Sequence, residues 1–308
     1  MNKKINGYSF LAIGKTQEST DAQEFARYIG LGSSFVLAVN PDKKQLDELR
    51  GFDSQNEPEY IKDGEQGKEA HINFVVKTDP EVNNGIEVVN QAMFLLRLQP
   101  AYNREKTKVQ VIDKYGNYTW ADAETAKSGA TLPANCMIDQ QHYRMACVGE
   151  CDLVAFLKKY LGVPNSLNYV NGSWVLADKA ADGIFGLEHI KDYFTGDFSE
   201  LREALALQPN NKVKLLYGVR TTDDGKQYQA IATRGDLILR NSAGSNAIAK
   251  LERDLKNIKD AGSYSNTEFR VQELQEYKVE PTNLEKPAQG GDGLPFAAPD
   301  NTGGMPWD

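Results

Sequence analysis

The stretch His71-Ile-Asn-Phe-Val-Val-Lys-Thr78 is rich in the β-branched and aromatic side chains that favour strands, and it marks the chain as one that builds a sheet. Three further stretches have the same character: residues 88–98, 108–112 and 118–121. Between the last two, the sequence Lys114-Tyr-Gly-Asn117 supplies the tight turn of a hairpin. A second hairpin is expected around the turn Thr222-Asp-Asp-Gly225, with strands at residues 212–220 and 226–233.

Apolar residues at helical spacing predict several helices between these strands. In residues 152–161 one face carries apolar side chains and the opposite face carries Lys158 and Lys159, and Gly162 and Pro164 then end the helix. Other helices are expected at residues 21–29, 41–50, 198–207 and 246–259. Strands, then helices, then strands predict an α+β fold: a small barrel or sheet that carries a helical insertion at about 150–208.

Composition separates a folded body from a tail. With 308 residues, of which 40% are hydrophobic, the chain can bury a sizeable core. Residues 1–280 are expected to form the body, and residues 281–308, rich in proline and glycine, a disordered acidic tail. No apolar stretch is long enough to span a bilayer, and residues 1–10 lack the apolar region of a signal peptide. Three cysteines suit a reducing cytoplasm.

Positive charge is concentrated in two segments, although the net charge is −8. Residues 97–120 hold five basic and two acidic side chains, a net of +3, and residues 212–240 hold six and three, again +3. Both segments also carry aromatic rings, and single strands are bound by this mixture of phosphate-contacting bases and stacking rings. The predicted DNA-binding residues are Tyr102, Arg104, Lys106, Lys108, Lys114, Tyr115, Tyr118, Trp120, Lys212, Lys214, Tyr217, Arg220 and Arg234.

By the two-residue period of a strand, three pairs of these residues are expected to share a face: Lys106 with Lys108, Tyr118 with Trp120, and Lys212 with Lys214. The two segments together are then expected to line one groove. The alternative is that the rings are half-buried pairs that stabilise the sheet and the lysines form a solvated face.

The tail contains two similar clusters, Gly293-Leu-Pro-Phe296 and Gly304-Met-Pro-Trp307, and Asp308 follows the second. A residue before proline is held extended, so each cluster presents an aliphatic and an aromatic side chain in a fixed relation. Such a segment suits an apolar groove on a partner protein. The predicted partner-binding residues are Leu294, Pro295, Phe296, Met305, Pro306, Trp307 and Asp308; the alternative is a frayed terminus in which the pairs occur by chance.

This tail resembles that of bacterial and phage single-stranded DNA-binding proteins, which typically ends in Pro-Phe after an acidic run. Here the acids are sparse, and the tip is Trp307 followed by Asp308. In addition, the stretch Val148-Gly-Glu-Cys-Asp-Leu-Val-Ala-Phe-Leu-Lys-Lys-Tyr-Leu161 is similar to a helix of single-strand binders of large double-stranded DNA phages. The resemblance implies an OB-like β-barrel core that sequesters single strands and a tail that recruits replication and recombination enzymes. It implies no catalytic residues.

Signals for other chemistry are weak. The chain has three histidines, no phosphate-binding loop and no nucleophile elbow, so no enzymatic activity is expected. The alternative is a nuclease that uses acids scattered along the sequence. Cys136, His142, Cys147 and Cys151 lie close enough in sequence to hold a structural zinc, but their irregular spacing favours buried free cysteines and no cofactor.

Two hypotheses follow. The first is a sequence-independent single-stranded DNA-binding protein of phage replication, recombination and repair, acting in the host bacterial cytoplasm. The second is a phage virion or packaging component with a docking tail. The first must bind bare single strands and the second need not.

Overall fold

A computed structural model describes residues 26–51, 53–65, 67–112, 118–124, 137–139, 143–162, 167–170, 173–176, 190 and 192–278. The predicted tail at 281–308, with all seven partner-binding residues, lies outside these ranges. Lys114 and Tyr115 of the first predicted hairpin also lie outside them. None of the helices within the described ranges combines the length and the apolar composition that crossing a bilayer requires.

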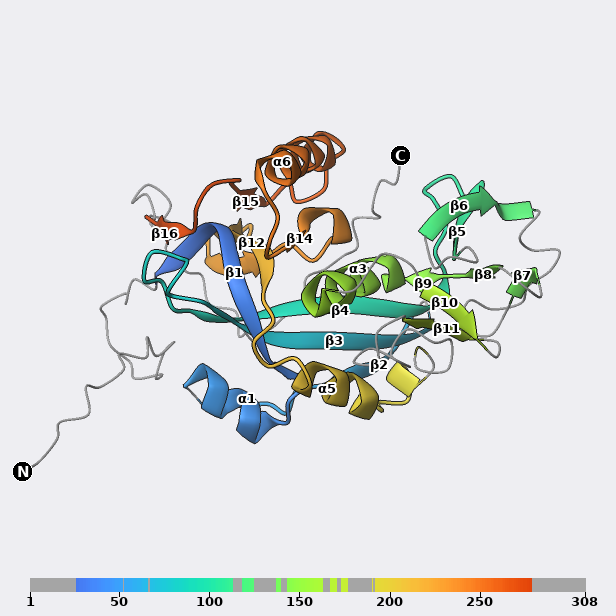
Figure 1. The fold of residues 1–308 in the computed structure, drawn as a ribbon, viewed down its shortest axis with the longest axis horizontal. Coiled ribbons are helices and arrows are strands. Elements are labelled where there is room, and N and C mark those ends of the chain that lie inside the picture. The colour runs from blue at the N-terminus through green and yellow to red at the C-terminus, as the bar shows by residue number, and fades with distance from the viewer. Residues whose placement is uncertain are drawn as a thin grey trace, which may run out of the picture.

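The protein has an α+β fold with a large, mostly antiparallel sheet at its centre (Figure 1). Six strands follow the order β13-β12-β1-β3-β4-β9, and four shorter strands pair with members of this row. The sheet is not closed, so the expected barrel is not confirmed. Its strands are β1 (Arg27–Val39), β2 (Ile61–Gly64), β3 (Gly67–Thr78), β4 (Val89–Pro100), β9 (Cys147–Val148), β12 (Val213–Thr221), β13 (Gln227–Ile231), β14 (Leu239–Arg240), β15 (Thr267–Phe269) and β16 (Gln275–Tyr277).

A smaller sheet with the order β6-β5-β8-β7 lies at one end of the molecule (Figure 1). Its strands are β5 (Lys108–Ile112), β6 (Tyr118–Asp122), β7 (Met137–Asp139) and β8 (Tyr143–Met145). We call the described residues 101–112 and 118–124 the arm. A further hairpin pairs β10 (Leu167–Val170) with β11 (Ser173–Leu176).

Helices cover both sides of the large sheet. They are α1 (Lys43–Arg50), α3 (Glu150–Leu161), α5 (Ser199–Ala206) and α6 (Ser245–Asp260), with a short 3-10 helix η3 (Gly235–Leu237) before α6. The helices expected at 41–50, 152–161, 198–207 and 246–259 are therefore confirmed to within a few residues. The strands expected at 71–78, 88–98, 108–112, 118–121, 212–220 and 226–233 are confirmed in the same way.

The helix expected at 21–29 is wrong for the residues of that range that the structure describes. Residues 27–29 begin β1, which changes partner along its length from β16 to β12 and then to β3. Glycine at position 30 allows this exchange. Its φ is 126°, and a Cβ atom there would lie 2.6 Å from the carbonyl oxygen of Glu273. A side chain would separate β1 from the segment that leads into β16.

Two hydrophobic cores lie on opposite sides of β12. Leu215 and Tyr217 face the main core, which joins the sheet to α3 and α5. Leu216, between them, faces a second core under α6. Because both faces of β12 are buried, its residues 215–219 form a continuous apolar run.

Two helices of the insertion expected at 150–208, α3 and α5, pack on the large sheet. Phe156 of α3 packs against Phe74 of β3 and Phe94 of β4, with ring centroids 4.6 and 5.1 Å apart. Leu201 of α5 belongs to the same core. These two helices therefore form part of the layer that covers one face of the sheet.

Candidate nucleic-acid interface

The arm has one buried face and one partly exposed face. On the buried face, Val109 and Val111 of β5 form a small core with Met145 of β8. The other face is fixed by the register of the hairpin, because directly opposed residues point the same way. We call this second face the Trp120 face; its members are the pairs Lys108–Asp122, Gln110–Trp120 and Ile112–Tyr118.

The Trp120 face changes character along the hairpin. At its inner end, Ile112 is buried in the main core and the ring of Tyr118 packs against that core. At its outer end, Trp120 keeps 40% of its surface exposed and Lys108 is exposed. Tyr118 and Trp120 do lie on one face, as the two-residue period predicts. Trp120 is the more exposed of the two, because Tyr118 is partly buried.

The turn before β5 adds two exposed bases, Arg104 and Lys106. Lys106 has a left-handed backbone with φ of 58°, and its N–H donates to the carbonyl of Asn103 at 2.9 Å. The expectation that Lys106 and Lys108 share a strand face is therefore wrong, because only Lys108 belongs to β5. The arm also carries the acids Glu105, Asp122 and Glu124, so its described residues hold as many acids as bases.

Tyr102 lies on the other side of the arm. It forms a bridge with Val109 and packs against the small core, half-buried. This position agrees with the alternative given for such rings, in which they are half-buried and stabilise the sheet.

The lysines predicted on the second segment are engaged within the protein. Lys212 pairs with the buried carboxylate of Asp79, and its ammonium lies 4.8 Å from the centre of the Phe35 ring. Lys214 donates to the carbonyl of Ala243 at 3.0 Å. These contacts join β12 to the loops at 79–88 and 241–244.

Tyr217 is wrong as a predicted stacking residue, because its side chain is fully buried in the main core. Its phenol lies 2.8 Å from the hydroxyl of Ser34, and burial raises the pKa of the phenol. Arg234 forms a two-point contact with Asp236, with its Nη2 atom 2.9 Å from Oδ2 and its Nε atom 3.2 Å from Oδ1. Arg220 is half-buried opposite Tyr228.

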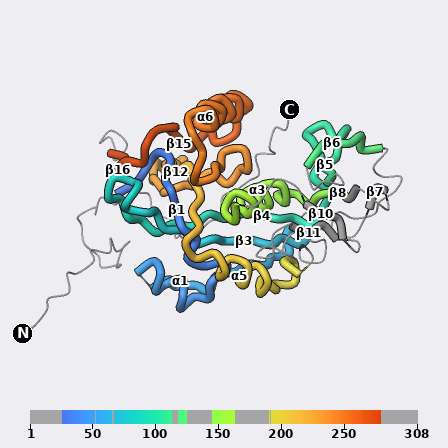
Figure 2. The backbone as a smooth tube through the Cα atoms, in the orientation of Figure 1, coloured from blue at the N-terminus to red at the C-terminus, as the bar shows by residue number. Residues whose placement is uncertain are grey.

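The two basic segments do not line one groove. The backbone trace shows β5 and β6 at one end of the molecule, whereas β12 lies beside β1 toward the other end (Figure 2). The pairing agrees, because β5 pairs with β6 and β8, while β12 pairs with β1, β13, β14 and β15. Of the two segments, the arm is the one that combines exposed bases with an exposed ring.

The cysteine and histidine cluster is described in part. Cys136 and His142 lie outside the described residues. Cys147 is buried, and burial raises the pKa of the Cys151 thiol to about 12. Within the described residues, no group of three metal-ligating side chains comes together.

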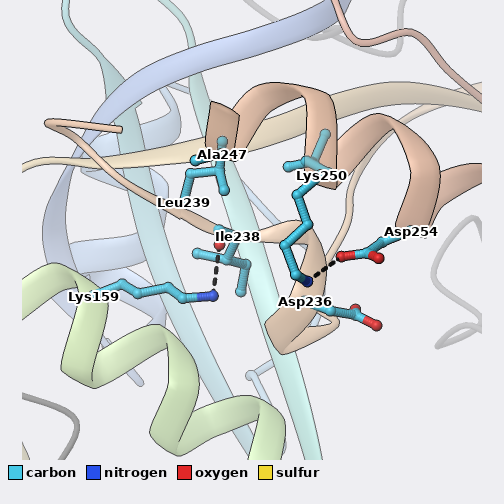
Figure 3. A pocket seen from close by; sticks show the side chains of 8 residues that line it. Lys159, Asp236, Ile238, Leu239, Ala247, Lys250 and Asp254 are labelled. Atoms are coloured by element: carbon cyan, nitrogen blue, oxygen red, sulfur yellow. Dashed lines mark hydrogen bonds and ion pairs between the residues drawn. The ribbon is translucent and has the colours of Figure 1, made fainter. Parts of the chain in front are cut away.

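A cavity of about 150 Å³ lies between α3, η3 and α6 (Figure 3). Lys159 and Lys250 reach it from opposite helices. Lys159 donates to the carbonyl of Ile238 at 2.6 Å, and Lys250 pairs with Asp254 at 2.6 Å. Asp236 adds a second carboxylate. The cavity therefore has two lysines, two carboxylates and an apolar floor. A phosphate-binding site needs an excess of positive charge, and this cavity does not have one.

Glu150 is the residue of this region that sequence reasoning did not single out. It is fully buried at the start of α3, and it accepts hydrogen bonds from the phenol of Tyr118 and the N–H of Cys147, each at 2.9 Å. The sequence feature that could have identified it is the pair Gly149-Glu150, at the start of the helix stretch that resembles one in phage single-strand binders. The partner of the glutamate could not be seen from sequence.

Comparisons with protein-family models, with curated proteins and with solved structures found no match for this chain.

Proposed function

We propose that this protein binds single-stranded DNA without sequence preference, with bases stacking on the Trp120 face of the arm. The observation that carries the proposal is the exposed indole of Trp120 beside Lys108, with Arg104 and Lys106 exposed in the adjoining turn. An aromatic ring accepts any base, because every base has a π-face, and stacking is worth about 1–3 kcal/mol per base. The balance of acids and bases on the arm makes stacking the larger contribution.

The arrangement of the large sheet supports an OB-like core. Counting its five longest strands in chain order, β1 lies between the second strand, β3, and the fourth, β12, and α3 follows the third strand, β4. The fifth strand, β13, comes close to β4, which draws the two sides of the sheet toward each other. OB-folds are partly open five-stranded barrels that bind oligonucleotides.

We further propose that the tail recruits replication and recombination proteins while the body holds DNA. The two Pro-aromatic clusters support this role, because a tethered aromatic beside acids suits an apolar pocket with a basic rim. Such a protein would protect single strands during phage DNA replication, recombination and repair in the host cytoplasm. It acts by stoichiometric binding and needs no catalytic residue.

Titration of a labelled oligo(dT) by fluorescence anisotropy tests the proposal, because the label reports binding without relying on protein tryptophans. We expect Trp120→Ala to weaken binding about tenfold or more, the loss of one stacked base. Leu207→Ala is the matched control, because Leu207 is 66% exposed at the end of α5 and lies outside the arm. Three exposed bases predict a slope of about −2 for log affinity against log salt.

If the wild type does not bind at micromolar protein and low salt, the proposal is refuted. The remaining hypothesis is then a virion or packaging component. Equal loss of affinity in Trp120→Ala and Leu207→Ala would place the strand elsewhere on the body.

A further inference from the structure

Glu150 joins the arm to the body of the protein. Its Oε1 atom accepts the phenol of Tyr118 on β6, and its Oε2 atom accepts the N–H of Cys147 on β9. The side chain has no exposed surface. One carboxylate therefore bridges the outer strand of the small sheet and an edge strand of the large sheet.

Burying a carboxylate is costly, so this position would favour an apolar residue if it served packing alone. The backbone is also adapted to it. Gly149 has φ of 82°, and a Cβ atom there would lie 2.0 Å from the carbonyl oxygen of Leu95. Glycine thus lets the start of α3 approach β4 closely enough for Glu150 to lie beneath Tyr118.

The two strands of the arm are held differently. Around β5, the backbone connects to the body: the N–H of Ala146 donates to the carbonyl of Gln110 at 2.9 Å, and the N–H of Ala101 donates to the carbonyl of Ala146 at 3.1 Å. In β6, Tyr118 contacts the body through its side chain. Trp120 follows two residues later on the same face, about 7 Å along the strand.

We propose that Glu150 is a positioning residue for DNA binding: through Tyr118 it fixes the orientation of β6 and of the Trp120 ring relative to the body. This inference rests on the proposed function. Neither Glu150 nor the phenol of Tyr118 contacts DNA. Both act by holding the ring where a base can stack while the strand continues along the body.

The test compares two tyrosines that each donate to a glutamate at 2.9 Å. Tyr118 donates to Glu150, and Tyr277 donates to Glu268 on a part of the sheet far from the arm. Tyr118→Phe is expected to weaken oligo(dT) binding about three- to tenfold, the effect of one hydrogen bond, whereas Tyr277→Phe leaves it unchanged. The salt slope stays that of the wild type, because no phosphate contact is lost.

A double-mutant cycle tests whether Glu150 and Tyr118 act through their shared contact. Glu150→Leu is expected to weaken binding as well, and the double variant Glu150→Leu/Tyr118→Phe to add little, because both changes remove the same contact. If the wild type binds DNA and Tyr118→Phe binds it equally tightly, the inference is overturned. Fully additive losses in the double variant would overturn it too.

Fluorescence of Trp120 without DNA tests the inference independently of the proposed function. In a Trp174→Phe/Trp307→Phe background, the emission reports Trp120 alone. Tyr118→Phe is expected to speed the decay of its anisotropy, because β6 gains freedom relative to the body. An unchanged decay would overturn the positioning role. A faster decay in a protein that fails to bind oligo(dT) would refute the proposed function only.

Discussion

At the residue scale, Asp152 combines an unfavourable environment with a structural contact. Its Oδ1 atom accepts the N–H of Gly235 at 2.7 Å, which ties α3 to η3. Burial raises the pKa of the Asp152 carboxyl to about 6, because the charged form is desolvated. The native state therefore binds a proton more tightly than the unfolded chain. Stability contributed by this group rises as the pH falls from about 6 toward 4, and is lost as the pH rises.

Asp152→Asn is expected to keep the hydrogen bond to Gly235 and to remove the buried charge. We expect a gain in the free energy of unfolding of about 2 kcal/mol at pH 7.5, measured by urea denaturation, that disappears near pH 4. Asp223→Asn, at an exposed turn position, is the control and should change neither value. A variant that is less stable than the wild type at pH 7.5 would contradict this account.

At the element scale, local pattern identified the helices α1, α3, α5 and α6 and six of the sixteen described strands, but it missed β1, the strand at the centre of the sheet. The hairpin of β5 and β6 was predictable because its residues and turn carry strand signals within a short span. In β1, Gly30 and Gly32 interrupt the apolar run, and they are required by distant neighbours. A Cβ atom at Gly32 would lie 2.8 Å from the ring of Tyr217. Sequence alone does not reveal such a neighbour.

The candidate site shows the same limit. Trp120 and Tyr217 are both aromatic residues in hairpin strands with bases nearby, and composition treats them alike. The structure separates them because α3 and α5 cover the side of β12 on which Tyr217 lies, whereas the outer end of the arm has no such layer in the described residues. Exposure of a ring thus depends on elements that are remote in sequence.

Lys212 illustrates how the packing of elements removes a base from the interface. Lys212→Met is expected to lower the free energy of unfolding by about 3 kcal/mol near neutral pH, because it leaves Asp79 buried without its cation. The hydrogen bond from Lys212 lowers the pKa of the Asp79 carboxyl, so this stabilisation is present above about pH 4 and is lost as the pH falls further.

Urea denaturation at pH 7 and pH 3 measures this effect, and oligo(dT) affinity should stay within twofold of the wild type. If Lys212→Met weakens DNA binding without changing stability, Lys212 belongs to the DNA interface as the sequence predicted. Lys226→Met provides the control, because the pair of Lys226 with Asp224 is largely exposed.

At the scale of the whole molecule, the proposed DNA interface and the predicted tail use separate parts of the chain. Deletion of residues 304–308 is expected to leave oligo(dT) affinity intact or raised, because an acidic segment competes with DNA for basic surfaces. It should abolish binding to the proposed partners, a purified helicase, polymerase or recombinase from the same source, measured by surface plasmon resonance. Deletion of residues 287–291, of equal length and without charge, is the control. Loss of DNA binding on removal of 304–308 would contradict this division.

During synthesis, β1 leaves the ribosome long before most of its partners. The side chain of Arg27 donates to the carbonyl of Gln227, 200 positions later, and a ribosome needs about 10–40 seconds to add that many residues. For this interval the N-terminal half of β1 is an unpaired edge, open to association with other chains. We expect folding to be completed late and slowly, as pairing between distant strands requires. A chain released before residue 213 never receives β12, and aggregation is its expected fate.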